Sequence, residues 1–332
     1  MIRYIINRIL LMFLVLLGVM IFIFALGRAP GTGDPVIGIL GEHYTQEAYD
    51  ELHAKLGLDK PIVTQFFDYL WGVVTRLDLG TSYYSKRAVS SEVFARFPVS
   101  LRVAMNAVMI SVPVGIILGM IAAYYQYSAL DYSITVTSML GQAMPNFWLG
   151  IMLILIFSLS FKWFPATGLS TWRGYVLPAL TMASTPISTI TRMTRATMLD
   201  VIRQDYIRTA RSKGLSERRV IFGHALQNAS IPIVTLVGNQ IALTVGGAAV
   251  VENIFLIPGL GSFLIFSINA NDHPSVQGTV LMFSMFVTLI NILVDILYGF
   301  IDPRIKAKYT SASRMAKKLN KSVLKATAKE VA

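Results

Sequence analysis

Residues 205–232 read DYIRTARSKGLSERRVIFGHALQNASIP, a strongly charged stretch between long apolar segments. Residues 192–224 contain eight Lys or Arg against three acids, a net charge of +5. Gly214 can adopt the left-handed conformation that ends a helix. Ser216 is a natural N-cap, and Glu217 is favourable in the first turn of the next helix. The stretch therefore predicts two short cationic helices that meet at Gly214, on one side of a membrane.

The composition indicates a polytopic, all-α integral membrane protein. Of 332 residues, 54% are hydrophobic and only 14% are charged, whereas soluble domains average about 25% charged residues. The formal net charge is +11, but the basic residues gather at the ends of apolar runs. That pattern is typical of membrane topology and argues against a nucleic-acid partner. The lack of cysteine excludes disulfides, thiol catalysis and cysteine-based metal sites.

The N-terminal region predicts a first span followed by an external module. Arg3 and Arg8 precede an uncharged run over residues 9–27, close to the ~20 apolar residues that cross a bilayer. Residues 29–98 carry nine acids and six bases, a net charge of −3, opposite in sign to the rest. Within them, Thr45 can cap one amphipathic helix, and a second apolar stripe follows Pro61. We expect a folded helical module outside the cytoplasm.

The remaining apolar segments predict five more spans. They cover residues 103–125, 134–161, 175–191, 229–251 and 276–301. The apolar run 254–268 is too short to cross and is split by the sequence PGLG at 258–261, so we expect a re-entrant or surface segment. In the second span, the pattern Gly115-x-x-x-Gly119 permits close helix packing.

Six spans place both termini in the cytoplasm. The N-terminus, the charged stretch and the tail then hold 19 of the 29 basic residues, as the positive-inside rule requires. The tail is either a cationic amphipathic helix on anionic lipid or disordered. The predicted units are residues 1–28 with the first span, the external module 29–98, the five-helix core 99–301 with a cytoplasmic loop at 192–228, and the tail 302–332.

Breaks and polar groups inside the predicted spans mark candidates for a translocation path. Proline within a helix removes a backbone hydrogen bond and kinks it, and broken helices at membrane depth often line a cavity. A simple packing kink is the alternative. Amides inside a span are expected to face other helices or a path, and Asp295 can instead pair a base such as Arg304. The candidates are Met144, Pro145, Asn146, Asn239, Gln240 and Asp295.

No sequence motif indicates an enzyme. The chain contains no G-x-x-x-x-G-K-[ST] phosphate loop and no H-E-x-x-H metal motif. We therefore expect no catalytic residues, no metal site and no cofactor in this chain. If ATP drives its activity, ATP and Mg²⁺ must be bound by a separate protein.

The motifs resemble those of ABC-importer permeases of the dipeptide/oligopeptide branch. Arg208-Thr209-Ala210, followed after three intervening residues by Gly214, is similar to the "EAA" loop of that family. This chain has Arg208-Thr209 where the general pattern has Glu-Ala, and its proline comes late, at Pro232. Further matches are Asp78-Leu79-Gly80, His224-Ala225-Leu226, the PGLG run and Asp302-Pro303-Arg304.

The resemblance implies a type I ABC importer permease fold and a set of partners. It implies a heterodimer with a paralogous permease, two cytosolic ABC ATPases, an external substrate-binding protein, and ATP-driven import of peptides by alternating access across a bacterial or archaeal cytoplasmic membrane. Relatives also carry nickel or other metal chelates, glutathione and oligosaccharides. A self-contained secondary transporter is the rival class, for which internal repeats or paired buried charges are expected. The ATPase-coupling loop implied by the family comprises Asp205, Tyr206, Arg208, Thr209, Ala210, Gly214 and Leu215.

Overall fold

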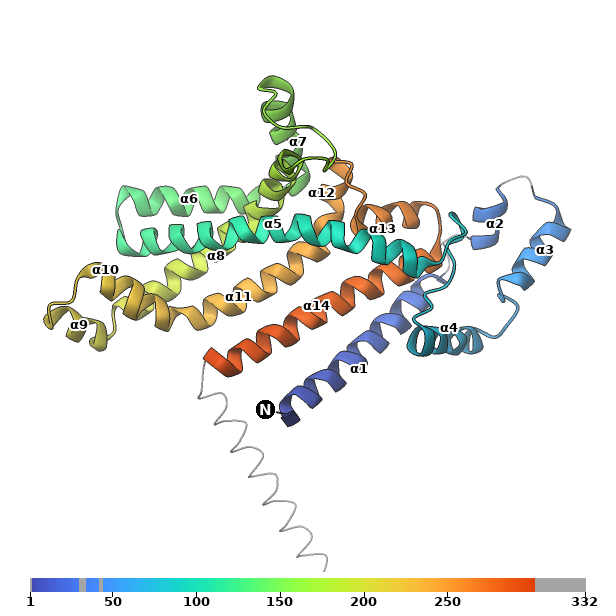
Figure 1. Cartoon of the computed structure of the whole chain (residues 1–332), viewed down its shortest axis with the longest axis horizontal. Helices are drawn as coiled ribbons and strands as arrows, with labels where there is room; N and C mark the ends of the chain where they lie inside the picture. The colour runs from blue at the N-terminus through green and yellow to red at the C-terminus, as the bar shows by residue number, and fades with distance from the viewer. Residues whose placement is uncertain (1, 30–33, 42–43, 302–332) are drawn as a thin grey trace, which may run out of the picture.

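The computed structural model describes residues 2–29, 34–41 and 44–301, and the regular secondary structure of this part of the chain is helical apart from one isolated β-bridge between Thr81 and Ala88. Most long helices run along the longest axis of the molecule, with a small helical module at one end and two short helices at the other (Figure 1). The tail 302–332, which includes Arg304, lies outside the described residues.

The module at one end follows the first long helix, α1 (Ile2–Leu26). It consists of α2 (Pro35–Leu40), α3 (Gln46–Lys55) and α4 (Ile62–Arg76). The predicted N-cap is confirmed, because Thr45 Oγ1 accepts a hydrogen bond from the amide of Ala48 at 3.3 Å. The module is attached to α1 through aromatic contacts, in which Phe24 packs edge-to-face against Phe66 of α4 with ring centroids 5.2 Å apart.

The middle of the chain forms a bundle around α8 (Val176–Ile202), which follows a short 3₁₀ turn at Trp172–Tyr175. Its neighbours are α5 (Val89–Tyr124), α6 (Ala129–Ala143) and α11 (Leu226–Gly246). The predicted glycine motif serves packing: a β-carbon at Gly119 would lie 2.6 Å from the carbonyl oxygen of Thr191 in α8. Helices α5 and α8 can approach so closely only because the residue has no side chain.

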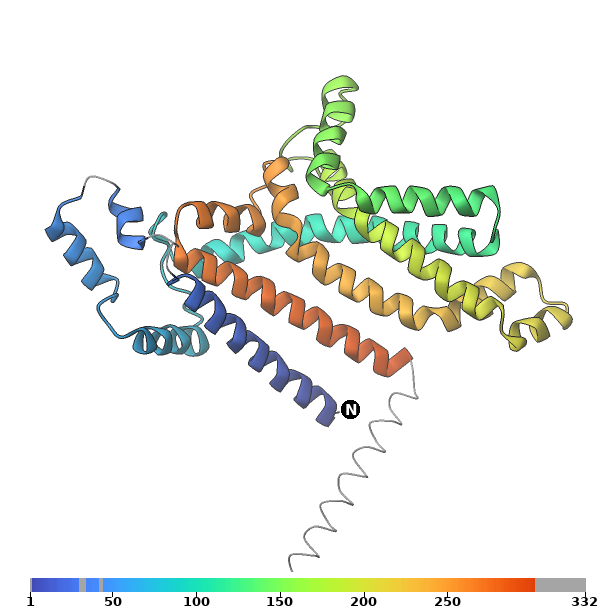
Figure 2. The same cartoon turned by 180° about the vertical axis from the view of Figure 1, so that it is seen from behind.

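The third predicted span is broken sharply rather than kinked. Helix α6 ends at Ala143, and α7 (Asn146–Leu153) continues into a π-helical segment, Ile154–Ser160. The two parts are bent by 102°, and α7 turns away from the bundle in both views (Figures 1 and 2). Met144 has an extended backbone with ψ of 123°, the conformation favoured before a proline.

Beyond α11 the chain makes the short elements expected of a non-spanning segment. The predicted fifth span over 229–251 is wrong in extent, because the helix breaks at Gly247 and α12 (Ala248–Ile254) begins. Helix α13 (Leu260–Asn269) has ten residues, too short to cross a bilayer. It leads into the last long helix, α14 (His273–Ile301), which runs beside α1 (Figure 2).

Four helical stretches in the described residues are long and apolar enough to cross a membrane, and the bent pair would make a fifth. The stretches are Ile6–Leu26, Val89–Tyr124, Glu217–Gly246 and His273–Val294. Helix α8, predicted as the fourth span, is not among them. Its many Ser and Thr hydroxyls donate back to its own carbonyls, as Thr181 Oγ1 does to the carbonyl oxygen of Leu177 at 2.8 Å. Central placement in the bundle lets such a helix be polar, because neighbouring helices cover it.

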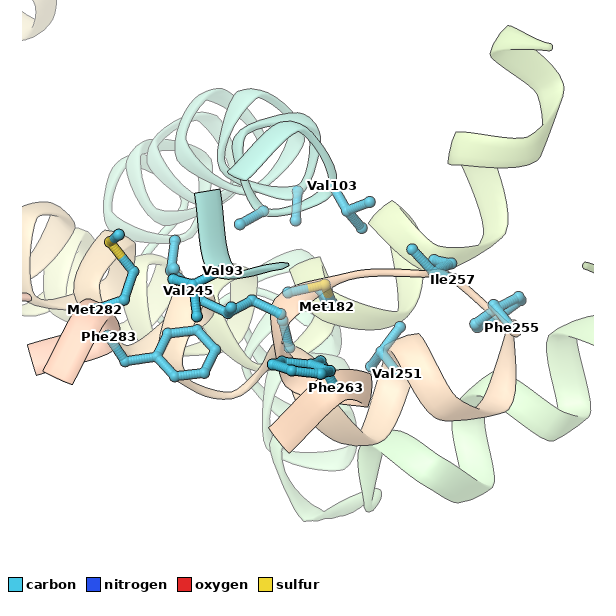
Figure 3. Packing of buried hydrophobic residues seen from close by; sticks show 14 of the residues in the cluster. Val93, Val103, Met182, Val245, Val251, Phe255, Ile257, Phe263, Met282 and Phe283 are labelled. Atoms are coloured by element: carbon cyan, nitrogen blue, oxygen red, sulfur yellow. The ribbon is translucent and has the colours of Figure 1, made fainter. Parts of the chain in front are cut away.

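The main core lies where α12 and α13 pack between the long helices (Figure 3). Phe255 and Ile257, in the turn after α12, are each 1% exposed. The close packing again requires glycine, since a β-carbon on Gly261 would lie 2.7 Å from the amide nitrogen of Ala249. The labelled core residues are Val93, Val103, Met182, Val245, Val251, Phe255, Ile257, Phe263, Met282 and Phe283.

Candidate coupling surface and polar membrane path

Helix α9 (Asp205–Ser212) ends in the way that Gly214 predicted. Gly214 has φ of +76°, in the left-handed region. Its amide donates to the carbonyl of Arg211 at 2.9 Å, and the amide of Leu215 donates to the carbonyl of Ala210 at 3.3 Å. These two bonds define a Schellman motif, which satisfies carbonyls left free at a helix end. Leu215 is half-buried against the same apolar cluster as Ala210, the hydrophobic contact that usually accompanies the motif.

One face of α9 is anchored to the membrane helices. Ile207 is fully buried and Ala210 is 7% exposed. They belong to an apolar cluster with residues of α5, α8, α11 and the π-helical turn Val220–Ala225. The cluster contains Met120, Ala123, Met198, Ile207, Ala210, Val220, Ile221, Ala225, Ala229 and Ile233. A displacement of α9 is therefore transmitted to α5, α8 and α11, since close-packed side chains transmit strain.

The opposite face of α9 is exposed and polar. It presents four of the predicted coupling residues: Asp205, Tyr206, Arg208 and Thr209. Partial desolvation raises the pKa of the Tyr206 phenol. The connection to α10 (Glu217–Arg219) is held by an exposed ion pair in which Arg211 Nε lies 2.8 Å from Glu217 Oε1. The exposed residues of 203–219 include six Lys or Arg against two acids, so the surface as a whole is cationic.

The candidate path residues fall into separate places. Met144 and Pro145 form the junction between α6 and α7, and Asn146 begins α7 with its Oδ1 buried and without a hydrogen-bond partner in the described residues. Asn239 and Gln240 lie on α11, with no hydrogen bond to Asn146 within the part of the chain that the structure describes. Asp295 lies on α14, and its side chain is outside the described part.

Of the two α11 amides, Asn239 is exposed, whereas Gln240 is half-buried. Helix α11 buries its Gly238 side instead, where a β-carbon would overlap Val294 of α14. The periodicity of 3.6 residues turns Asn239 away from that contact. An exposed amide on an otherwise apolar helix needs a polar surrounding or a partner, because unpaired polar groups are costly in lipid.

Comparison with known proteins decides the family. Residues 115–307 match the family described as binding-protein-dependent transport system inner membrane components, and residues 1–104 match the N-terminal family of such components. The chain belongs to this permease family. The permease is 37% identical over 335 residues to the di/tripeptide transport system permease protein DppB of Pseudomonas aeruginosa (strain UCBPP-PA14), covering 92% of this chain and 99% of the relative.

Other relatives and a solved structure agree with that assignment. The permease is 37% identical to the oligopeptide transport system permease protein AppB of Bacillus subtilis (strain 168), covering 91% and 99% of the two chains. Among solved structures, a chain of the MetNI methionine ABC transporter in inward-facing form has a TM-score of 0.56 at 14% identity. It covers 64% of this permease and 97% of that chain, a likeness of fold.

The sequence analysis missed a buried polar junction beside the core of the permease. Glu252 of α12 is fully buried, and one of its carboxylate oxygens accepts from the amide of Ser262 at 2.9 Å. Ser100 of α5 accepts from the amide of Leu260 at 2.7 Å. Both bonds satisfy free amides in the first turn of α13, as an N-cap does. The signal in the sequence that could have revealed this junction is Glu252, an acid within the apolar run 248–257.

Proposed function

We propose that this chain is the permease subunit of an ATP-driven importer and forms half of its translocation pathway. Helix α9 carries the proposal: its apolar face is anchored in the cluster around Ile207 and Ala210, while its cationic face is free at one end of the molecule. That surface docks on a cytosolic ABC ATPase, which binds ATP and Mg²⁺, and two such ATPases serve the paired permeases.

The proposed topology has six spans, with both termini in the cytoplasm and residues 29–98 outside. Taking α8 and the bent α6–α7 pair as spans gives this number. The arrangement in Figure 1 supports it, because the start of α1 and the described end of α14 both point toward the side that carries α9, away from the α2–α4 module. The protein is thus a multi-pass component of a bacterial or archaeal cytoplasmic membrane.

The pathway requires a second permease. The exposed Asn239 favours a path at the face of this bundle rather than inside it, to be closed by a paralogous partner. An external binding protein delivers the substrate to the outer mouth. Movement of the coupling helices on ATP binding then opens the paired bundles outward, and hydrolysis returns them to the inward-facing state.

Peptides are the proposed substrate class. The names of the relatives from Pseudomonas aeruginosa and Bacillus subtilis support it, since these are di/tripeptide and oligopeptide permeases. Nickel or other metal chelates, glutathione and oligosaccharides are alternatives within the same family. A self-contained secondary transporter would need neither ATPase nor binding protein, which makes the two classes easy to separate.

The deciding experiment is gentle solubilisation of the membranes followed by mass spectrometry of what co-purifies with this chain. We expect a second permease and one or two ATPases with Walker motifs. Reconstituted into liposomes with a binding protein, the complex should take up a labelled dipeptide only with ATP. A lone chain, or a homo-oligomer that transports without any ATPase, would overturn the proposal in favour of a secondary transporter.

The location of the path is tested by introducing bulky side chains at the candidate residues. Tryptophan at Asn146, Asn239 or Gln240 should lower uptake while leaving the amount of assembled complex unchanged. Trp172, in the loop before α8, is 71% exposed, and its replacement by Phe is a control for aromatic changes elsewhere. Wild-type uptake in all three tryptophan variants would remove these residues from the pathway.

A further inference from the structure

A buried ion pair joins two helices of the bundle at the end that carries α9. Arg195 Nε lies 2.6 Å from Asp131 Oδ1, and Arg195 Nη2 donates to Asp131 Oδ2 at 2.8 Å. The contact is therefore bidentate, the geometry in which a guanidinium binds a carboxylate most specifically. The Asp131 side chain is only 2% exposed, while that of Arg195 is 28% exposed.

The surroundings of Asp131 fix its carboxylate further. Oδ2 also accepts from the amide of Tyr127 at 3.0 Å, and the amide of Asp131 donates to Ser128 Oγ, the N-cap of α6, at 3.3 Å. The carboxylate sits in the first turn of α6, where the helix dipole favours negative charge. It is thus held by the α5–α6 turn, by its own helix and by α8 together.

The pair connects the coupling helix with the broken helix. Arg195 lies in the last part of α8, which ends at Ile202 and leads through a short turn into α9. Met198 of α8 packs in the same buried cluster as Ile207 of α9. At its other end α6 again approaches α8, because a β-carbon on Gly141 would lie 2.9 Å from Ser188 Oγ. Helix α6 then stops at the 102° bend beside Pro145.

We propose that Asp131 and Arg195 are positioning residues that make α6 follow α8 when the coupling helix moves, so that the motion reaches the bend at Pro145. Separating a buried pair leaves an uncompensated charge, which is strongly unfavourable. The two helix ends therefore shift together rather than slide. The proposal rests on the proposed function, in which α9 is displaced by an ATPase.

A cysteine reporter tests this in the full complex, because the wild-type permease contains no cysteine. Ala143→Cys places a thiol at an exposed position at the end of α6, and its maleimide labelling is compared with and without ATP plus vanadate. We expect ATP to change the labelling rate. In Asp131→Asn and Arg195→Gln the ATP-dependent change should fall by about tenfold, within the usual range of coupling between sites. The combined exchange Asp131→Arg with Arg195→Asp should restore it.

The control is Asp68→Asn in the α4 module, where Lys60 Nζ lies 2.6 Å from Asp68 and both side chains are more than half exposed. This variant should label like the parent. Arg195→Lys keeps the charge without the bidentate fork and should give an intermediate change. The inference is overturned if ATP does not change the labelling of the reporter, or if Asp131→Asn responds to ATP like the parent. It is also overturned if the charge-exchange variant assembles into the complex but does not regain the ATP-dependent change in labelling. Loss of assembly in all the pair variants also overturns it, because the pair would then be a folding determinant. Co-purification of the ATPases judges the proposed function separately.

Discussion

Two glycines show how one residue type serves two physical needs in this permease. At Gly119 the need is space, because a β-carbon would lie 2.6 Å from a carbonyl oxygen of α8. At Gly214 there is open space, with nothing within 4 Å of an added β-carbon, and the need is a φ of +76°. A substitution therefore strains helix packing at the first position and only the local backbone at the second.

Gly119→Leu should destabilise the permease by about 1–3 kcal/mol, the usual cost of overpacking a core. Helices α5 and α8 would have to separate to admit the side chain. The thermal midpoint of unfolding in detergent measures the effect. Gly18→Leu in α1 is the matched control, because a β-carbon there meets nothing within 4 Å. Equal midpoints for the two variants would contradict the close approach of α5 and α8.

Gly214→Val should lower ATP-dependent uptake, whereas Gly214→Asn should largely retain it. Asn visits the left-handed region that the Schellman motif requires far more readily than a β-branched residue does. Both variants should reach the membrane in wild-type amounts, since the substituted side chain faces open space. A loss of uptake that is equal in Asn and Val would show that something other than backbone conformation matters at this position.

At the scale of the element, α9 joins two surfaces with different partners. Its buried face, Ile207 and Ala210, packs on this chain's own helices, and its exposed face, which includes Arg208 and Thr209, is the proposed docking surface for an ATPase. Ala210 thus lies in a packed cluster of this chain, which leaves little room for a larger side chain. The motif residue that resembles the family pattern and the residues of the proposed docking contact are neighbours on opposite faces.

Ala210→Leu and Thr209→Leu separate these two roles with the same new side chain. Ala210→Leu should lower the thermal midpoint of the isolated permease, because replacing the methyl group by isobutyl overpacks the cluster. Thr209→Leu should leave that midpoint within the small range typical of surface changes and instead reduce the ATPase recovered with the permease. The reverse pattern would mean that α9 is rotated relative to the membrane helices.

At the scale of the whole molecule, the coupling helix and the α2–α4 module lie at opposite ends of the long axis (Figure 1). If the long helices cross the bilayer, these ends lie on opposite sides of it. Ser85, beside the module, and Ser212, in α9, are both exposed. Each can carry a single cysteine in a chain that otherwise has none.

Ser85→Cys should react with a membrane-impermeant maleimide in intact cells, and Ser212→Cys only after permeabilisation. The physical reason is the sidedness that the basic residues around α9 and the acidic module impose. Gel shift of the labelled permease is the measurement. Labelling in the opposite order would reverse the proposed topology, and labelling of both in intact cells would refute a spanning bundle.

The sequence by itself determined the apolar helices, the cap at Thr45, the helix end at Gly214, the close approach at Gly119 and the short segment around 258–261. Each depends on local backbone chemistry or on the length of an apolar run, which residues within a few turns decide. Only the tertiary structure showed that the break at Pro145 is a sharp bend, that α8 can be polar because other helices surround it, and that Asn239 points away from its own bundle. It alone paired Asp131 with Arg195, 64 residues apart. Such contacts depend on how helices pack in space, which the local pattern of a single chain does not contain.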